Sequence, residues 1–167
     1  SYIDKHSSIG ILGPKVLNPD KTLQRSFKKF PTLWNSLCRA CYLDKVFPRS
    51  KLFGGALMTF FSGESISNVD VLIGAFWLIK REALDNVGLL DENFFMYSED
   101  KDWCKRFRSA GWNVVYFPDA EIIHYGGGSS ANAPIRFNVE QIRANLQYWK
   151  KHHQKFSQVV FYLIMIL

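Results

Sequence analysis

Apolar residues run almost unbroken at two places in the chain, and both runs predict buried strands. The first, at 9–17 (IGILGPKVL), leads into the turn-forming triplet Asn18-Pro19-Asp20. The second, at 69–79 (VDVLIGAFWLI), predicts a central strand with Gly74 and Ala75 in its middle. A pair of small residues inside such a strand indicates close approach of a ligand or another backbone, most directly at Gly74.

Apolar residues at helical spacing predict several helices, and Gly88 and Gly111 mark the ends of two of them. A loop is expected at 50–68, where glycine and serine are frequent, and a turn at Pro118-Asp119. The predicted helices span 32–47, 80–87, 99–110 and 138–153, and further short strands are predicted within 22–30 and at 114–117 and 120–124.

Composition and charge narrow the class of protein. The chain has 167 residues, of which 47% are apolar and 22% charged, as in one globular domain, which excludes a disordered chain and a disulfide-stapled mini-protein. A net charge of +6 suggests an anionic partner. The basic residues are dispersed and no nucleic-acid-binding motif is present, so we expect no nucleic acid among the partners. Three cysteines suit a reducing compartment, and Cys38 and Cys41 lack a second ligand pair for zinc, so both are expected in the core.

Both ends of the chain look cut. The first residue is not Met. The buried strand predicted at 9–17 would also need neighbouring strands, which we expect from a sheet that precedes it. The last twelve residues are almost entirely apolar. Twelve residues are too few to span a membrane but suit the first half of a membrane-spanning helix, and a core segment at the end of the domain is the alternative. Lys150, Lys151 and Lys155 precede this tail and favour an end that faces the membrane from the cytoplasm. We therefore divide the chain into a domain at 1–153 and an apolar tail at 154–167.

Candidate chemistry lies at two places in the second half. Glu99, Asp100 and Asp102 begin a predicted helix, where acidic residues complement the helix dipole and Ser98 would be the cap. The aromatic run just before them suggests instead that they line a cleft, in which an ionised carboxylate accepts a proton from a hydroxyl. His124 is followed by a glycine-rich loop whose backbone N–H groups suit phosphate oxygens, although a structural histidine is the simpler interpretation and the loop matches neither the Walker nor the Rossmann pattern.

An ordered series of motifs resembles the inverting family 2 glycosyltransferases, and within them the bacterial rhamnosyltransferases that build cell-surface polysaccharide. The segment 10–23 also resembles the middle of those enzymes, so the resemblance covers most of 9–153. The motifs are Gly74-Ala75, 78–84 (LIKREAL), 87–92 (VGLLDE), 94–104 (FFMYSEDKDWC), Ala110-Gly111, Pro118-Asp119-Ala120 and His124.

This resemblance implies an α/β chain with a partial GT-A fold, namely the acceptor-side half with a C-terminal helix. It implies Asp100 as the catalytic base, Glu99 as its neighbour in the acceptor site, and His124 as one ligand of a Mg²⁺ or Mn²⁺ cofactor. Donor and acceptor contacts are expected from Gly74, Ala75, Gly126, Gly127 and Gly128. The implied partners are a nucleotide-diphospho-sugar donor and a saccharide or lipid-linked acceptor, at the cytoplasmic face of the plasma membrane.

The departures from the family pattern matter equally. The family's first strand, its nucleoside-binding acids and its Asp-x-Asp metal motif lie upstream of anything that corresponds to Ile9, so we expect this chain alone to be inactive. Asp102 completes an apparent Asp-x-Asp, but its place assigns it to the later motif. A non-catalytic remnant or binding module is the alternative function. Two arginines are candidates to neutralise the diphosphate, or alternatively are solvated helix charges: Arg136 and Arg143. Three tryptophans are candidates to stack on a sugar ring, or alternatively belong to the core: Trp77, Trp103 and Trp149.

Overall fold

Two long parallel strands form the centre of the molecule, β1 (Ile9–Leu17) and β7 (Asn113–Ile123). The computed structural model describes residues 2–126 and 133–166. Ile11 pairs with Val114 and Val16 pairs with Ile122, so residues far apart in the sequence are fixed in one register. β1 is buried along nearly its whole length, as its apolar run predicts.

Short strands extend this pair. The second strand of the chain, β2 (Leu23–Gln24), and β6 (Leu78–Ile79) run antiparallel to β1, and β4 (Ser67–Asn68) runs antiparallel to β7. A separate two-stranded ladder pairs β3 (Phe27–Lys28) with β5 (Val71–Leu72). The main sheet therefore has the order β2-β1-β7-β4, with β6 also on β1.

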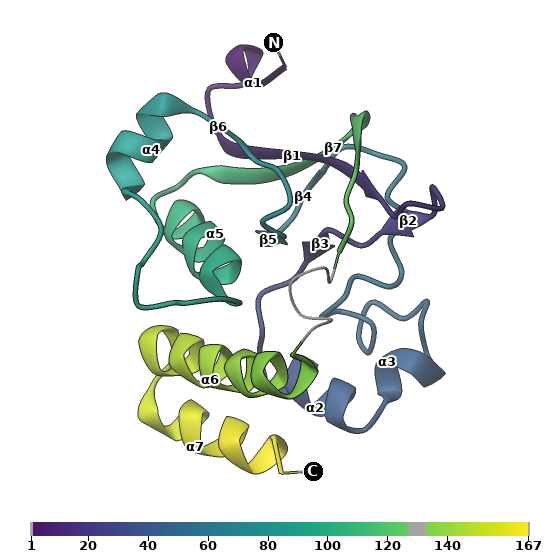
Figure 1. Ribbon diagram of the computed structural model, residues 1–167, viewed down its shortest axis with the longest axis vertical. Helices are drawn as coiled ribbons and strands as arrows, with labels where there is room; N and C mark the ends of the chain where they lie inside the picture. The colour runs from purple at the N-terminus through teal and green to yellow at the C-terminus, as the bar shows by residue number, and fades with distance from the viewer. Residues whose placement is uncertain (1, 127–132, 167) are drawn as a thin grey trace.

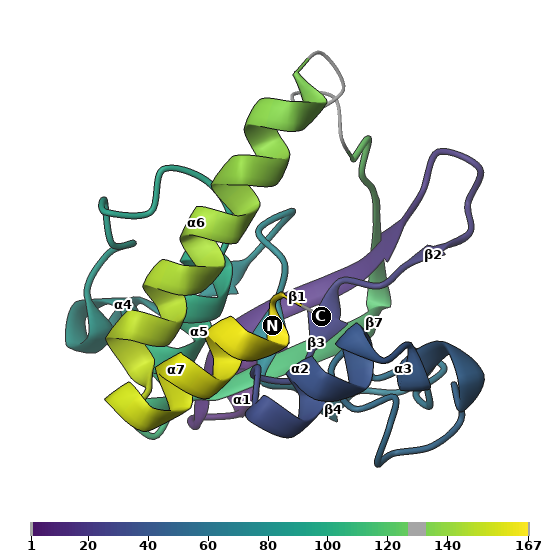
Figure 2. The ribbon, with the colours of Figure 1, turned by 90° about the horizontal axis from the view of Figure 1, so that it is seen from below.

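Helices cover the sheet in layers, with α5 between the sheet and α6 (Figure 1). Seen from below, α6 and α7 form the outer layer and α2 lies beside α7 (Figure 2). The described helices are α1 (Tyr2–Lys5), α2 (Leu33–Ala40), α3 (Leu43–Val46), α4 (Arg81–Val87), α5 (Glu99–Ser109), α6 (Pro134–His152) and α7 (Lys155–Ile164). This mixed arrangement confirms the predicted α/β class.

The main core lies where α5 packs on the sheet. Phe107 of α5 is fully buried and joins Ile11 and Val114 in one hydrophobic cluster. A Cβ added at Gly10 would lie 2.7 Å from Phe107 Cδ1 and 2.8 Å from Trp112 Cβ. Glycine at position 10 therefore lets β1 and α5 approach closely, which fixes the helix that carries the acidic motif.

The strand predicted at 69–79 is wrong. The segment divides into β5 and β6 with a turn at Gly74 and Ala75, and β6 pairs with the edge of β1. Ile73 N–H donates to Ser26, and Ala75 N–H donates to Ile73, which turns the chain away from the β5 ladder. The run is apolar because its two halves pack against different parts of the core, and no central strand results.

The two strands predicted at 114–117 and 120–124 form one strand, β7. The turn predicted at Pro118-Asp119 is a bulge instead, where Pro14 pairs with Phe117 and the next residue of β1 pairs with Glu121. Three residues of β7 thus have no partner on β1, which absorbs the proline without ending the strand.

The predicted helices agree best with the observed ones where a glycine marks the end of the helix. α4 and α5 occupy the predicted spans, and Gly88 ends α4 with φ +81°. The helix predicted at 32–47 divides into α2 and α3 because Tyr42 has φ +55°. α6 begins four residues before position 138, with Pro134 in its first turn.

The two cysteines expected in the core differ in exposure. The prediction is right for Cys38, which is buried, and wrong for Cys41, which is exposed.

A second, smaller core joins α6 to α7. Trp149 of α6 and Phe161 of α7 are buried and stack with ring centroids 4.3 Å apart. The outer side of α7 is apolar and exposed, with Phe156 at 77% and Leu163 at 62%. Across residues 2–126 and 133–166, no helix has the length and hydropathy needed to cross a membrane.

Candidate functional site

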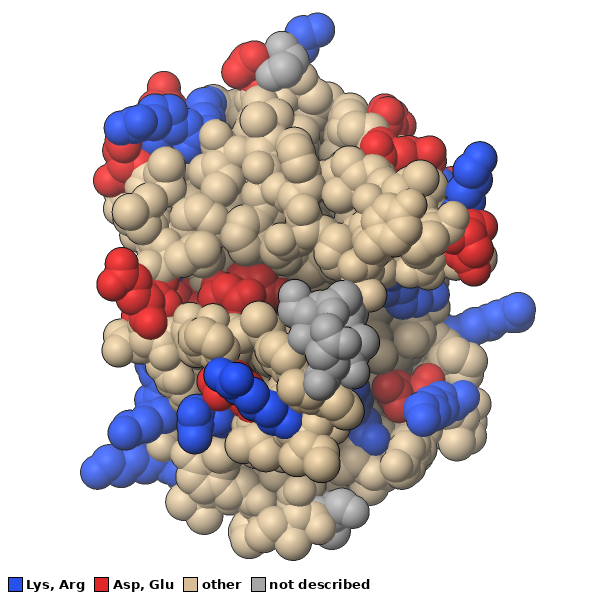
Figure 3. All heavy atoms as spheres, in the orientation of Figure 1, with Lys and Arg blue, Asp and Glu red and all other residues tan. Residues whose placement is uncertain are grey.

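The predicted catalytic carboxylates lie together at the first turn of α5. Tyr97 and Ser98, which precede the helix, both have left-handed backbone conformations, with φ of 67° and 65°. Such conformations cost about 1–3 kcal/mol each in residues other than glycine, and they concentrate at functional sites. In Figure 3, acidic atoms line a recess of the surface between the sheet and α6, over the start of α5.

Ser98 occupies the N-cap position, as predicted, but its side chain does not cap the helix. The Ser98 hydroxyl is buried and donates instead to Oδ1 of Asn145 on α6, at 3.4 Å. The start of α5 is therefore held by tertiary contact with α6 in place of local capping.

Glu99 and Asp100 differ in environment. Oε2 of Glu99 is buried and has no hydrogen-bond partner among the described residues. Burial, and secondarily the negative charge of Asp100, raises the pKa of Glu99. Oδ1 of Asp100 accepts a hydrogen bond from the backbone N–H of Lys101 at 2.7 Å. A buried carboxylate oxygen without a partner is costly, so Glu99 suits a ligand that donates a hydrogen bond.

Asp102 has a different environment from its two acidic neighbours. It is fully buried, and its carboxylate accepts hydrogen bonds from Arg106 at 2.9 Å, from Lys151 at 2.6 Å and from His152 at 2.7 Å. Burial alone would raise its pKa, but these three partners outweigh burial and lower the pKa to about 2. Asp102 therefore anchors the last turn of α6 to α5, consistent with its separation from a metal motif.

His124 follows the last residue of β7 and is oriented by Gln24 of β2. Nδ1 of His124 lies 2.7 Å from Oε1 of Gln24, whose own amide nitrogen donates to Asn18. Because a carbonyl oxygen only accepts, Nδ1 carries the proton and Nε2 holds the lone pair. Histidine ligands of metals are commonly fixed in this way, so His124 fits one position in a divalent cation site. The described residues contain no group of three His, Cys, Asp or Glu able to hold a metal ion together.

Gly74 and Ala75 lie in a turn that is linked to α5 through two tryptophans. A Cβ added at Gly74 would lie 3.6 Å from the ring of Trp77. Trp77 packs on Trp103 of α5 with ring centroids 5.3 Å apart, and Trp103 donates from Nε1 to the carbonyl of Gly88. Trp103 and Trp149 are almost fully buried, so the core interpretation holds for both.

The structure brings only some of the predicted residues together. Glu99 and Asp100 are neighbours, but no hydrogen bond or ion pair within 2–126 and 133–166 links them to His124. Gly126 is exposed and is the last residue of the described range 2–126, and Gly127 and Gly128 lie outside the described residues. Arg143 pairs with Glu140 on the exposed face of α6, which agrees with a solvated charge.

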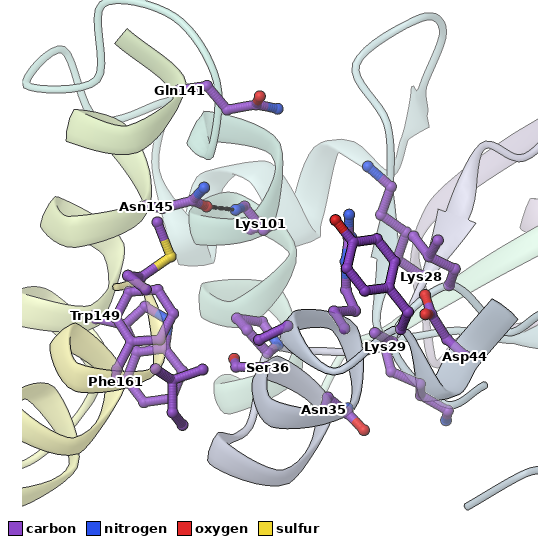
Figure 4. A pocket seen from close by; sticks show the side chains of 18 of the residues that line it. Lys28, Lys29, Asn35, Ser36, Asp44, Lys101, Gln141, Asn145, Trp149 and Phe161 are labelled. Atoms are coloured by element: carbon purple, nitrogen blue, oxygen red, sulfur yellow. Dashed lines mark hydrogen bonds between the residues drawn. The ribbon is translucent and has the colours of Figure 1, made fainter. Parts of the chain in front are cut away.

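The sequence analysis did not predict a pocket of about 590 Å³, which is lined in part by Lys101 of α5 (Figure 4). Lys101, which follows Asp100, reaches into it and donates from Nζ to Oδ1 of Asn145 at 2.5 Å. No local signal could reveal this pocket, because its walls come from segments more than a hundred residues apart. Its basic side chains, called here the basic wall, are Lys28, Lys29, Arg39, Lys45 and Lys101.

Comparison with known proteins identifies the family. The model of the family described as "Glycosyltransferase like family 2" matches residues 32–144, which is more than half of the chain. The chain therefore belongs to glycosyltransferase family 2, and its α/β architecture is consistent with part of a GT-A fold. The matched range includes the acidic motif, the Gly74 turn and His124.

Curated relatives carry rhamnosyltransferase names. N-acetylglucosaminyl-diphospho-decaprenol L-rhamnosyltransferase of Mycobacterium tuberculosis is 33% identical over 129 residues, which cover 75% of this chain and 40% of the relative. The dTDP-rhamnosyl transferase RfbF of Shigella flexneri is 28% identical, over 61% of this chain and 38% of its own length. This chain thus spans about two fifths of the length of these relatives. No solved structure matches it.

Proposed function

We propose that this chain is the acceptor-side part of an inverting glycosyltransferase that transfers rhamnose from a nucleoside diphosphate sugar to a lipid-linked saccharide in bacterial surface polysaccharide synthesis. The observation that carries the proposal is the pair Glu99 and Asp100, which begins α5 within the range matched by the family and includes a buried carboxylate oxygen without a partner among the described residues. The names of the relatives support rhamnose and a sugar-diphospho-lipid acceptor.

The proposed reaction is a single displacement. Asp100 takes the proton of an acceptor hydroxyl, and the oxygen attacks the anomeric carbon of the donor sugar. The bond from that carbon to the diphosphate breaks, and the nucleoside diphosphate leaves with the bonding electrons. Glu99 orients the acceptor, because its unpartnered Oε2 is able to accept a hydrogen bond from a second sugar hydroxyl.

A divalent cation is part of the proposal. When bound, Mg²⁺ or Mn²⁺ would neutralise the diphosphate of the leaving group. Of the described residues, His124 would supply one ligand through Nε2, and Gln24 would keep the imidazole in the required tautomer. The other ligands would come from the diphosphate and from residues outside those described.

Replacing His124 with Phe should therefore raise the Mn²⁺ concentration needed for half-maximal transfer by about tenfold or more, the scale seen when a metal site loses a ligand or its support. The measurement uses the protein expressed from the complete reading frame, with Mn²⁺ binding followed by electron paramagnetic resonance in the presence of a nucleoside diphosphate. His6→Phe, at an exposed residue that directly follows α1, is the matched control. Equal Mn²⁺ dependence in both variants would remove His124 from the metal site.

The function itself is tested by supplying a panel of radiolabelled nucleotide sugars with a polyprenyl-diphosphate-linked sugar in lipid vesicles. We expect label from dTDP-rhamnose to enter the lipid fraction with the protein from the complete reading frame, and the protein to sediment with the vesicles because α7 exposes apolar side chains. The 167-residue chain alone should transfer nothing. Failure of every donor with the complete protein would favour the non-catalytic remnant.

A further inference from the structure

The pocket beside the acidic motif has two chemically different walls (Figure 4). Its basic wall comes mainly from β3, α2 and α3, and Lys101 of α5 adds a fifth cation. The opposite wall comes from α6 and α7, where Trp149, Phe161, Ile164 and Met165 form an apolar part and Gln141 and Asn145 of α6 add two amides. A ligand that fills the pocket must therefore carry an anionic group and an apolar group side by side.

Most of the positive charge of the basic wall is not neutralised by the described residues, although Lys29 pairs with Asp70 at 3.8 Å. Asp44 is the single carboxylate among the described residues that line the pocket. Lys28, Arg39 and Lys101 make no ion pair within 2–126 and 133–166. Burial, reinforced by the charges of Lys28 and Arg39, lowers the pKa of Lys101 to about 8 despite the opposing effect of Asp100. A bound anion would relieve this repulsion, as expected of a site built for one.

The apolar wall continues out of the pocket onto the surface. Ile164 and Met165 lie at the end of α7, and Leu163 and Ile166 beside them are 62% and 83% exposed. An extended hydrocarbon chain that leaves the pocket past Ile164 and Met165 would meet apolar side chains at the end of α7. Trp149 offers no stacking place for a nucleobase, since its ring is already stacked on Phe161 and His153.

The pocket is connected to the proposed base through Lys101 of α5. Lys101 follows Asp100 directly, and its ammonium group is held by Asn145 inside the pocket. In a sugar-diphospho-lipid, one sugar ring separates the diphosphate from the hydroxyls of the sugar. The charge of Asp100 acts on Lys101, so a diphosphate bound near Lys101 would place the acceptor sugar toward the base.

We propose that this pocket binds the diphosphate of a polyprenyl-diphosphate-linked acceptor, with Lys28, Arg39 and Lys101 on the phosphates and the polyprenyl chain along α7. The proposal rests on the proposed function, because it assigns the acceptor of that reaction to a defined place. The binding of a polyprenyl diphosphate is nevertheless measurable without any transfer.

The test is the affinity of the 167-residue chain for geranylgeranyl diphosphate, by titration calorimetry. Lys28→Gln with Arg39→Gln should weaken binding tenfold or more, and Lys5→Gln with Lys21→Gln, an equal charge change on exposed residues away from the pocket, should change it less than twofold. Met165→Ser should weaken the binding of geranylgeranyl diphosphate but leave the affinity for inorganic pyrophosphate unchanged. Circular dichroism checks that each variant is folded.

Three outcomes would overturn the proposal. Equal loss in the pocket and control variants would mean that binding depends on net charge alone. Pyrophosphate that binds as tightly as geranylgeranyl diphosphate would mean that the pocket takes a free phosphate and no lipid. A matching loss of affinity for dTDP in the Lys28→Gln/Arg39→Gln variant would assign the basic wall to the donor.

Kinetics separate this proposal from the proposed function. In the protein from the complete reading frame, the Lys28→Gln/Arg39→Gln variant should raise the KM for the lipid-linked acceptor about tenfold and leave the KM for the nucleotide sugar unchanged. Transfer with an unchanged acceptor KM would refute the pocket and keep the transferase. Absence of transfer together with pocket-dependent binding of geranylgeranyl diphosphate would refute the transferase and keep the pocket.

Discussion

Asp100→Asn, made in the protein from the complete reading frame, is expected to lower kcat for sugar transfer by about 10²–10⁴-fold, the contribution typical of a general base. An amide has almost the same shape as the carboxylate but does not accept the proton of the acceptor hydroxyl. Its oxygen still accepts the hydrogen bond that Asp100 takes from the N–H of Lys101, so the start of α5 should keep its conformation. The measurement is the initial rate of transfer at saturating donor and acceptor.

Two variants serve as controls for this result. Asp119→Asn, on the exposed part of β7, makes the same chemical change far from α5 along the chain and should leave kcat unchanged. Glu99→Gln should mainly raise the acceptor KM, since Glu99 is proposed to orient the sugar. Because burial raises the pKa of Glu99, that residue is the rival base. Full activity in Asp100→Asn with loss of kcat in Glu99→Gln would transfer the role of base to Glu99.

Asp102→Asn is expected to lower the free energy of unfolding of the 167-residue chain by about 2–4 kcal/mol. Removing one partner of a buried charge cluster costs about 3–5 kcal/mol, and the lower range applies here because Lys151 keeps 35% of its side chain exposed. Loss of the carboxylate leaves Arg106 without its ion-pair partner and frees the last turn of α6 from α5, while Lys151 keeps its ion pair with Asp91. Urea unfolding followed by circular dichroism measures the change.

Asp85→Asn is the matched control, because Asp85 makes an i,i+4 pair with Arg81 on exposed α4 and should contribute little. The pH dependence provides a second check. The pKa of Asp102 is about 2 in the folded chain, below the value of about 3.9 in an unfolded chain, so its contribution is complete above about pH 5 and is lost as the pH falls through about 2. The stability difference between wild type and Asp102→Asn should shrink over this range. Equal stability of the two at pH 7 would contradict the anchoring role.

Local sequence determined the features that depend on neighbouring residues. The apolar run at 9–17 predicted β1, and helical spacing with a glycine stop predicted α4 and α5. These signals are reliable because turn geometry and helix termination are set within a few residues. The motif series also predicted the family, which the family match confirms. The roles of Asp100, Glu99 and His124 remain predictions.

Tertiary structure decided what depends on partners distant in the sequence. The run at 69–79 has the hydropathy of a central strand, but the chain turns at Gly74 because β3 and β1 each offer an edge to one half of it. Glu99, Asp100 and Asp102 look alike in sequence, and only the packing of α6 separates Asp102, buried among Arg106, Lys151 and His152, from the other two. The basic wall has the same origin. Lys28, Arg39 and Lys101 are unremarkable as single lysines and arginines, and they become a site only where β3, α2 and α5 meet.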